Sequence, residues 1–227
     1  HSETSMQVSA GLTQSSLPRL FFGRHPRDKL KTSSMHLIVY LHGFRSSPRS
    51  SKAELTKNAV TKLQAQGLKI EWYCPQLPPS PLEAMTMVQT HIDACNYSEI
   101  SIMGSSLGGY YATYLGERYF SKVSLLNPAI EPARDLEKYI GEQTSWHSED
   151  SFYFKPEYIQ ELRDLYVTHI SHPDRYFLLA AKGDEVLDWN EMVAKYSGAH
   201  QLVFEGGDHA ISNYPEYLPK VLEFHGL

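Results

Sequence analysis

From Met35 onward, short apolar runs alternate along the chain with stretches whose apolar residues recur at helical spacing. Six runs rich in β-branched and aromatic residues are the expected strands: 36–41, 70–73, 99–103, 122–126, 176–181 and 201–204. Neighbouring parallel strands need a crossover connection, usually a helix, so this alternation is typical of a parallel sheet. The pattern predicts an α/β fold, a three-layer αβα sandwich with about six parallel strands.

Local signals mark where the helices begin and end. The segments 51–54 and 80–83 both read Ser-x-x-Glu, the capping-box pattern in which a serine side chain accepts a bond from the backbone three residues on. Gly67 is a suitable stop for the first of these helices. Three further helices are expected over 107–119, 190–196 and 214–224.

The connection over about 128–174 is too long for an ordinary loop and has helical signals of its own, at 131–140 and 156–167. We expect it to form a cap inserted into a single domain over 35–227, because 227 residues fit one domain. Residues 1–34 are rich in Ser and Arg and have no periodicity. They are expected to be a leader, or an arm left by the expression vector.

Composition excludes several classes of protein. The net charge of −5 offers no basic footprint for nucleic acid, and no apolar run approaches the roughly 18 residues of a membrane span. Cys74 and Cys95 form no CxxC pair, so we expect buried thiols in a reducing, cytoplasmic compartment. His169 and His172 resemble a metal pair but lack an apparent third ligand. No metal and no cofactor are expected.

The chemistry is indicated at residues 104–108, which read Gly-Ser-Ser-Leu-Gly directly after an expected strand. A GxSxG turn between a strand and a helix raises its central serine above the sheet, with glycines where larger side chains would clash. Ser106 is therefore the candidate nucleophile, and Gly104 and Gly108 form the elbow. The alternative is a glycine-rich turn whose serine is only a helix cap. Ser105 is out of register and is expected to be structural.

A serine nucleophile needs a base, and the base needs an orienting acid. Asp184 follows the fifth expected strand and His209 follows the sixth, which gives the chain order Ser, Asp, His of α/β-hydrolases. Asp188 is the alternative acid, although its place near the start of a helix also suits a cap. We expect Asp184 to be the acid.

Acyl transfer also needs donors for the oxyanion of the tetrahedral intermediate. The backbone N–H groups of Phe44, after the first strand, and of Leu107, after the nucleophile, are the expected pair. His42 and Gly43 belong to the same loop, and His42 is expected to support it by hydrogen bonding and not to act chemically.

Six ordered motifs together resemble the small bacterial α/β-hydrolases of the YqiA/YcfP esterase type. They lie at 42–48, 75–78, 104–113, 127–129, 183–188 and 205–210. The resemblance covers the chain from Met35 to the end and implies strand order 2-1-3-4-5-6. It also implies a serine esterase acting on short acyl esters, and on thioesters too, with Ser106, Asp184 and His209 as its triad.

The substrate is left open by the sequence. Six aromatic residues of the insertion either roof an acyl pocket or only pack the cap onto the body: Tyr139, Trp146, Phe152, Tyr153, Phe154 and Tyr158. We expect a serine carboxylesterase with a small-molecule acyl ester or thioester as its partner. The alternatives are an acyl-CoA thioesterase or acyltransferase with the same triad, and a non-catalytic binding protein of this fold. The oligomeric state is not predicted.

Overall fold

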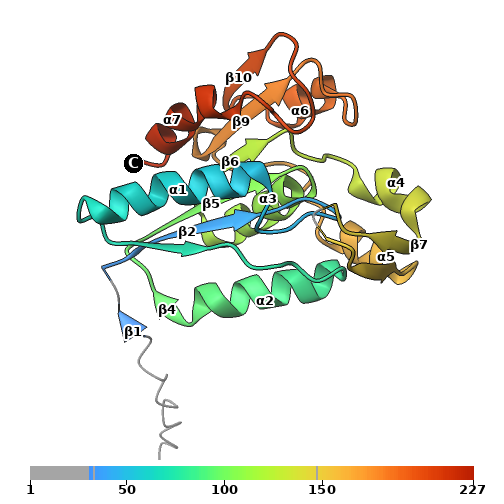
Figure 1. Ribbon diagram of the computed structural model, residues 1–227, viewed down its shortest axis with the longest axis horizontal. Helices are drawn as coiled ribbons and strands as arrows, with labels where there is room; N and C mark the ends of the chain where they lie inside the picture. Colours follow the sequence, from blue (N-terminus) through green and yellow to red (C-terminus); the bar gives the residue numbers. More distant parts are fainter. Residues whose placement is uncertain (1–30, 33, 147) are drawn as a thin grey trace, which may run out of the picture. The chain divides into compact units, whose positions relative to one another are not determined.

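The computed structural model describes residues 31, 32, 34–146 and 148–227. Six strands of this part form one sheet in the order β3-β2-β5-β6-β9-β10, and all neighbours are parallel (Figure 1). The strands are β2 (His36–Leu41), β3 (Ile70–Tyr73), β5 (Glu99–Ser105), β6 (Lys122–Leu126), β9 (Tyr176–Ala181) and β10 (His200–Phe204). Counted along the chain, this is the expected order 2-1-3-4-5-6, so the predicted fold is confirmed.

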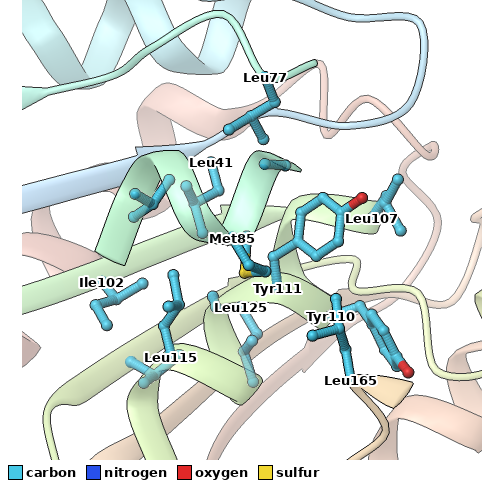
Figure 2. Packing of buried hydrophobic residues seen from close by; sticks show 14 of the residues in the cluster. Leu41, Leu77, Met85, Ile102, Leu107, Tyr110, Tyr111, Leu115, Leu125 and Leu165 are labelled. Carbon is cyan, nitrogen blue, oxygen red and sulfur yellow. The ribbon is translucent and has the colours of Figure 1, made fainter. Parts of the chain in front are cut away.

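Helices cover both faces of the sheet. They are α1 (Ser51–Ala65), α2 (Pro81–Asp93), α3 (Leu107–Tyr119), α6 (Trp189–Lys195) and α7 (Tyr214–Phe224). Side chains alternate between faces along a strand. Ile38 and Tyr40 of β2 therefore join the core against α1 and α7, whereas Leu37 and Leu41 join the core against α2 and α3. Figure 2 shows the core between the sheet and helices α2 and α3, in which Met85 of α2 lies near Tyr111 of α3.

The two predicted capping boxes differ in outcome. The Oγ of Ser80 accepts the N–H of Glu83 at 3.1 Å and Pro81 is the first residue of α2, as expected. The box expected at 51–54 is wrong. The carbonyl of Ser50 already accepts the N–H of Glu54 at 3.0 Å, so α1 begins one residue earlier than that box requires.

The insertion between β6 and β9 contains helices and also a hairpin that we did not predict. Its elements are α4 (Pro132–Leu136), a 3₁₀ turn (Glu137–Tyr139), β7 (Gly141–Thr144), β8 (Ser151–Phe154), α5 (Glu157–Asp164) and a 3₁₀ turn (Pro173–Arg175). The helix expected over 131–140 is shorter, because Gly141 turns the chain with φ of 126° and starts the hairpin. The helix expected over 156–167 ends at Asp164. Residues 141–144 read Gly-Glu-Gln-Thr, without the run of apolar and β-branched residues that indicates a strand.

Three smaller expectations concern the ends and the thiols. The expected leader, 1–34, lies outside the described residues except at 31, 32 and 34; there β1 (Lys31–Thr32) pairs in parallel with β4 (Cys95–Asn96). Cys74 and Cys95 are free thiols, but both are partly exposed, so the expected burial is wrong. No helix in the described part of the chain is long and apolar enough to cross a bilayer.

Candidate active site

Ser106 lies between β5 and α3 in a backbone conformation that few residues adopt, with φ of 56° and ψ of −121°. Such strain costs about 1–3 kcal/mol and persists only where surrounding contacts impose it. Here the Ser106 N–H donates to the carbonyl of Leu126 at 3.1 Å, and the Ser106 carbonyl accepts the N–H of Ala129 at 2.9 Å. The end of β6 therefore holds the backbone of the candidate nucleophile on both sides.

The two glycines of the elbow are required by close backbone approach. A Cβ on Gly108 would lie 1.9 Å from the carbonyl oxygen of Leu41, and one on Gly104 would lie 2.1 Å from that of Gly108. Any side chain at either position would force α3 away from β2 or β5. The glycines thus bring the start of α3, and with it Ser106, against the end of the first sheet strand.

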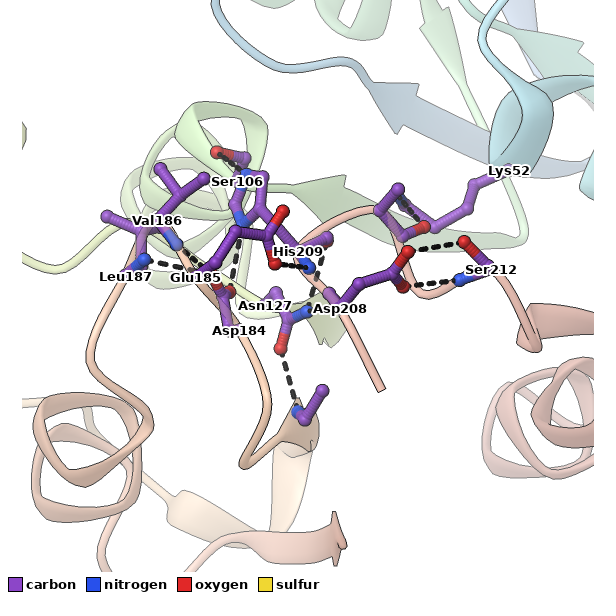
Figure 3. Close-up of polar contacts among 12 residues, drawn as sticks. Lys52, Ser106, Asn127, Asp184, Glu185, Val186, Leu187, Asp208, His209 and Ser212 are labelled. Carbon is purple, nitrogen blue, oxygen red and sulfur yellow. Dashed lines mark hydrogen bonds and ion pairs between the residues drawn. The ribbon is translucent and has the colours of Figure 1, made fainter. Parts of the chain in front are cut away.

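The structure brings the three predicted triad residues together (Figure 3). The Nδ1 of His209 lies 2.8 Å from Oδ2 of Asp184, and its Nε2 lies 3.0 Å from the Oγ of Ser106. A carboxylate can only accept hydrogen bonds, so Nδ1 carries the ring proton. Nε2 is then free to accept a hydrogen bond from the serine hydroxyl. This is the arrangement in which an imidazole can take a proton from serine.

The acid that reaches the imidazole is Asp184, not Asp188. The Asp184 side chain is fully buried, and its other oxygen accepts the N–H groups of Val186 and Leu187, both at 2.8 Å. Asp188 instead begins α6, where its Oδ1 accepts the N–H of Asn190 at 2.8 Å.

The loop after β2 lies directly beside Ser106. A Cβ on Gly43 would be 3.2 Å from the Cβ of Ser106. Neither the N–H of Phe44 nor that of Leu107 has a hydrogen-bond acceptor among the described residues. Two unpaired donors flanking a serine are what an oxyanion needs.

His42 supports this loop through both of its ring nitrogens. Its Nδ1 donates to the carbonyl of Gly43 at 2.8 Å, and its Nε2 accepts the N–H of Leu77 at 2.9 Å. The ring is buried and joins the loop after β2 to the proline-rich segment after β3. The expected supporting role agrees with these contacts.

Two residues without a predicted role hold the loop of His209 in place. Asn127, fully buried, donates from its amide to the carbonyls of Asp208 and His209, both at 3.1 Å, and accepts the N–H of Ala181 at 2.9 Å. Glu185 accepts the backbone N–H of His209 at 2.9 Å. Both residues occur in the motifs of the family resemblance, and the left-handed φ of 43° at Asn127 is the kind of position that favours asparagine.

A cavity of about 570 Å³ begins at the loop after β2. Gly43, Phe44 and Leu107 line it next to Ser106, and Leu77 and Tyr111 add apolar wall. This volume suits a small organic ligand. Among the described residues no group of three or more His, Cys, Asp or Glu could hold a metal ion, and His169 and His172 form no such site.

The cap aromatics divide between the two roles considered from the sequence. Phe44 packs against Tyr139, Phe152 and Phe154, with ring centroids 5.5, 5.8 and 5.2 Å away. Of these three, Phe152 also lines the cavity, whereas Phe154 is buried in the core. The cap hairpin therefore packs against Phe44 of the loop after β2 and closes one side of the cavity.

The hairpin also binds the loop through the residue after Phe44. The carbonyl of Arg45 accepts the N–H of Trp146 at 2.7 Å, and the Arg45 Nε donates to the carbonyl of Thr144 at 2.7 Å. The guanidinium lies 3.8 Å above the indole ring. Trp146 is therefore neither a roof nor core packing; it stacks at the surface.

Solved structures of similar fold include the following three proteins. A monoacylglycerol lipase from Paleococcus ferrophilus is 16% identical, with a TM-score of 0.60, over 83% of this chain and 93% of that one. Est1E from Butyrivibrio proteoclasticus, solved with ferulic acid bound, is 16% identical with a TM-score of 0.58, over 83% and 87%. Mouse alpha/beta hydrolase domain-containing protein 10 is 16% identical with a TM-score of 0.58, over 82% and 89%. At this identity the likeness establishes the fold.

A sequence family matches most of the chain. Residues 37–226 match the family described as Uncharacterised protein family (UPF0227), which covers the whole sheet, the elbow, the cap and the histidine loop. The chain therefore belongs to the UPF0227 family, and its fold is that of the α/β-hydrolases.

Proposed function

We propose that this protein is a serine carboxylesterase that hydrolyses short-chain acyl esters through an acyl-enzyme intermediate. One observation carries the proposal. The hydroxyl of Ser106, the imidazole of His209 and the buried carboxylate of Asp184 form a continuous hydrogen-bonded line, with distances of 3.0 and 2.8 Å. Packing at an ordinary protein surface does not hold a serine and a histidine in a hydrogen-bonded line with a buried carboxylate.

Acylation follows from the donors and acceptors of the site. Nε2 of His209 takes the proton of Ser106 as its Oγ attacks the ester carbonyl carbon. The negative charge that develops on the carbonyl oxygen is met by the N–H groups of Phe44 and Leu107, each worth about 2.7–4 kcal/mol in comparable sites. Asp184 holds the imidazole in its tautomer and stabilises the imidazolium.

Deacylation reuses the same groups. The imidazolium of His209 gives its proton to the leaving alcohol, and the acyl group remains on Ser106. The neutral imidazole then takes a proton from a water molecule that attacks the acyl carbon. The proton returns to the Ser106 oxygen when the acid leaves, so the site is regenerated without any external acceptor.

The cavity and the structural neighbours support an ester substrate. The cavity has an apolar wall formed by Leu77, Tyr111 and Phe152. This wall lies beside the loop of Gly43 and Phe44, where part of an acyl ester would bind. The neighbours include Est1E, solved with ferulic acid bound, and a monoacylglycerol lipase. Two free cysteines support a reducing compartment, and we place the protein in the cytoplasm as part of this proposal.

The test is a panel of p-nitrophenyl esters from acetyl to dodecanoyl, measured on the wild type and on Ser106→Ala. The wild type should prefer the shorter esters, and Ser106→Ala should lose nearly all turnover. The neighbouring Ser105 is buried at the end of β5, so Ser105→Ala is the matched control for the mutation itself. A fluorophosphonate should label Ser106 alone, as located by mass spectrometry of the peptides.

Other outcomes point to other functions. Release of CoA from acyl-CoA at a rate above ester hydrolysis would favour a thioesterase, and transfer of the acyl group to an added alcohol would favour an acyltransferase. Turnover by Ser106→Ala within tenfold of the wild type would refute the serine mechanism. Failure of the fluorophosphonate to react would support a non-catalytic binding protein.

A further inference from the structure

Lys52 reaches from α1 to the loop that carries the base, 158 positions away in the sequence. Its Nζ donates to the carbonyl oxygen of Ala210 at 2.7 Å, directly after His209 (Figure 3). One helical turn further, Thr56 is fully buried and its Oγ1 lies 2.8 Å from the hydroxyl of Tyr214. The same face of α1 therefore contacts both ends of the turn that follows the base.

That turn is strained and needs outside support. Ile211 has φ of 50°, a left-handed conformation that is a genuine outlier for a β-branched residue. Gly206 and Gly207, just before the base, also have positive φ. Asn127 holds the carbonyls of residues 208 and 209, and Lys52 holds the next one. Lys52 completes a run of three anchored carbonyls around His209.

The position of Lys52 is unfavourable for a lysine on other grounds. It lies in the first turn of α1, where the helix dipole opposes a cation. Burial lowers the pKa of Lys52 to about 8, although the carboxylates of Asp208 and Asp184 act to raise it. Hydrogen bonds from Ser212 lower the pKa of Asp208, and the charge of Lys52 lowers it further. The stability of the fold therefore does not explain why a lysine occupies position 52.

We propose that Lys52 is a positioning residue for the general base: its ammonium group holds the carbonyl of Ala210 and so keeps the imidazole of His209 between Ser106 and Asp184. This inference rests on the proposed esterase function. Lys52 touches no reacting atom and acts only through the loop. Its removal should therefore lower kcat and leave KM nearly unchanged.

The pH profile gives a second consequence. The charged groups that act on Lys52 are Asp208 of the base loop and Asp184 of the loop after β9. Above about pH 8 the amine keeps N–H groups but loses its attraction to the two carboxylates. The hold on the loop weakens, so kcat should fall on the alkaline side near pH 8. Arginine keeps its charge throughout this range, so Lys52→Arg should remove that alkaline fall.

The experiment measures p-nitrophenyl acetate hydrolysis and melting temperature for Lys52→Met, Lys52→Arg and Lys57→Met. Lys57 is an exposed lysine of the same helix with no contact to the base loop, so it controls for loss of a positive charge. For Lys52→Met we expect kcat to fall about tenfold or more, with KM within threefold and the melting temperature unchanged or higher. Lys52→Arg should recover most of kcat, and Lys57→Met should match the wild type.

Three results would overturn the inference: wild-type kcat in Lys52→Met, a loss of kcat matched by a lower melting temperature, or the same alkaline fall in Lys52→Arg as in the wild type. Ser106→Ala in the same assay separates the two proposals. If Ser106→Ala is inactive and Lys52→Met is normal, only the role of Lys52 fails. If Ser106→Ala retains turnover, the esterase mechanism fails.

Discussion

The side-chain amide of Asn127 donates to the carbonyl oxygen of His209 at 3.1 Å. The same side chain accepts the N–H of Ala181, at the end of the strand that leads to Asp184. Its neighbours in the chain hold the backbone of Ser106. One short segment after β6 therefore fixes Ser106, the strand that leads to Asp184 and the loop of His209 relative to one another.

The Asn127→Asp variant tests the two hydrogen bonds that Asn127 donates separately from the one that it accepts. Asn127→Asp keeps an oxygen for the Ala181 N–H but turns two donated bonds to the base loop into contacts between oxygens. We expect kcat to fall about 10²-fold, because a displacement of about 1 Å at a reacting group costs that much. Asn127→Gly, which tolerates the left-handed backbone, should also lose activity. Wild-type kcat in Asn127→Asp would contradict this role.

Asp184 and Asp188 can be distinguished by what each mutation damages. In Asp184→Asn an amide group faces the imidazole and favours the wrong tautomer, so kcat should fall by about 10³–10⁴ while the fold remains. Asp188→Ala removes the cap of α6 and should lower the free energy of unfolding by about 0.5–2 kcal/mol with little change in kcat. The measurements are kcat and urea unfolding of both variants. A collapse of kcat confined to Asp188→Ala would make Asp188 the acid.

The sequence predicts the sheet, and which three residues meet at its edge, better than it predicts the contacts that support them. A dense apolar run such as 36–41 indicates a buried strand. The order of Ser106, Asp184 and His209 along the chain already indicates the fold. The contacts of Lys52 and Asn127 join residues 158 and 82 positions apart. No local pattern encodes such pairs, because they depend on how the loops pack at the ends of the strands.

The hairpin of the cap shows a second limit. Residues 141–144 read Gly-Glu-Gln-Thr, which has no apolar alternation, and their strand character comes only from pairing with Ser151–Phe154. Local propensity therefore predicts a longer helix before Gly141 than the structure contains. Tertiary pairing overrides weak propensity in segments of this length.

A buried histidine far from the site should make the fold sensitive to acid. Burial lowers the pKa of His225 to about 3 from 6.5, and its Nε2 lies 2.9 Å from the Oγ of Ser124. The unfolded chain therefore takes up a proton near pH 6.5 and the folded chain only near pH 3. Stability is full above pH 6.5 and falls below it by up to about 1.4 kcal/mol per pH unit from this group.

Urea unfolding between pH 7 and pH 4 measures this dependence. His225→Gln should be less stable at pH 7, because it disturbs the buried contact with Ser124, but its stability should fall less steeply with acid. His200→Gln is the control, since His200 is exposed on β10. An equal slope in the wild type and in His225→Gln would show that other groups cause the acid sensitivity.

The cap hairpin offers a test of where the acyl chain binds. Phe152 lines the cavity, whereas the next residue of β8, Tyr153, points to the other face and is 56% exposed. Phe152→Ala should enlarge the cavity and raise the ratio of kcat/KM for octanoyl over acetyl ester by about tenfold or more, because each additional buried methylene contributes about 0.8 kcal/mol. It should also slow acetyl ester turnover, because the ring of Phe44 loses an edge contact at 5.8 Å worth about 0.5–1.5 kcal/mol. Tyr153→Ala is the control and should leave the kcat/KM ratio and the acetyl ester turnover unchanged. If the two variants shift the chain-length preference equally, the acyl chain does not bind against this face of the hairpin.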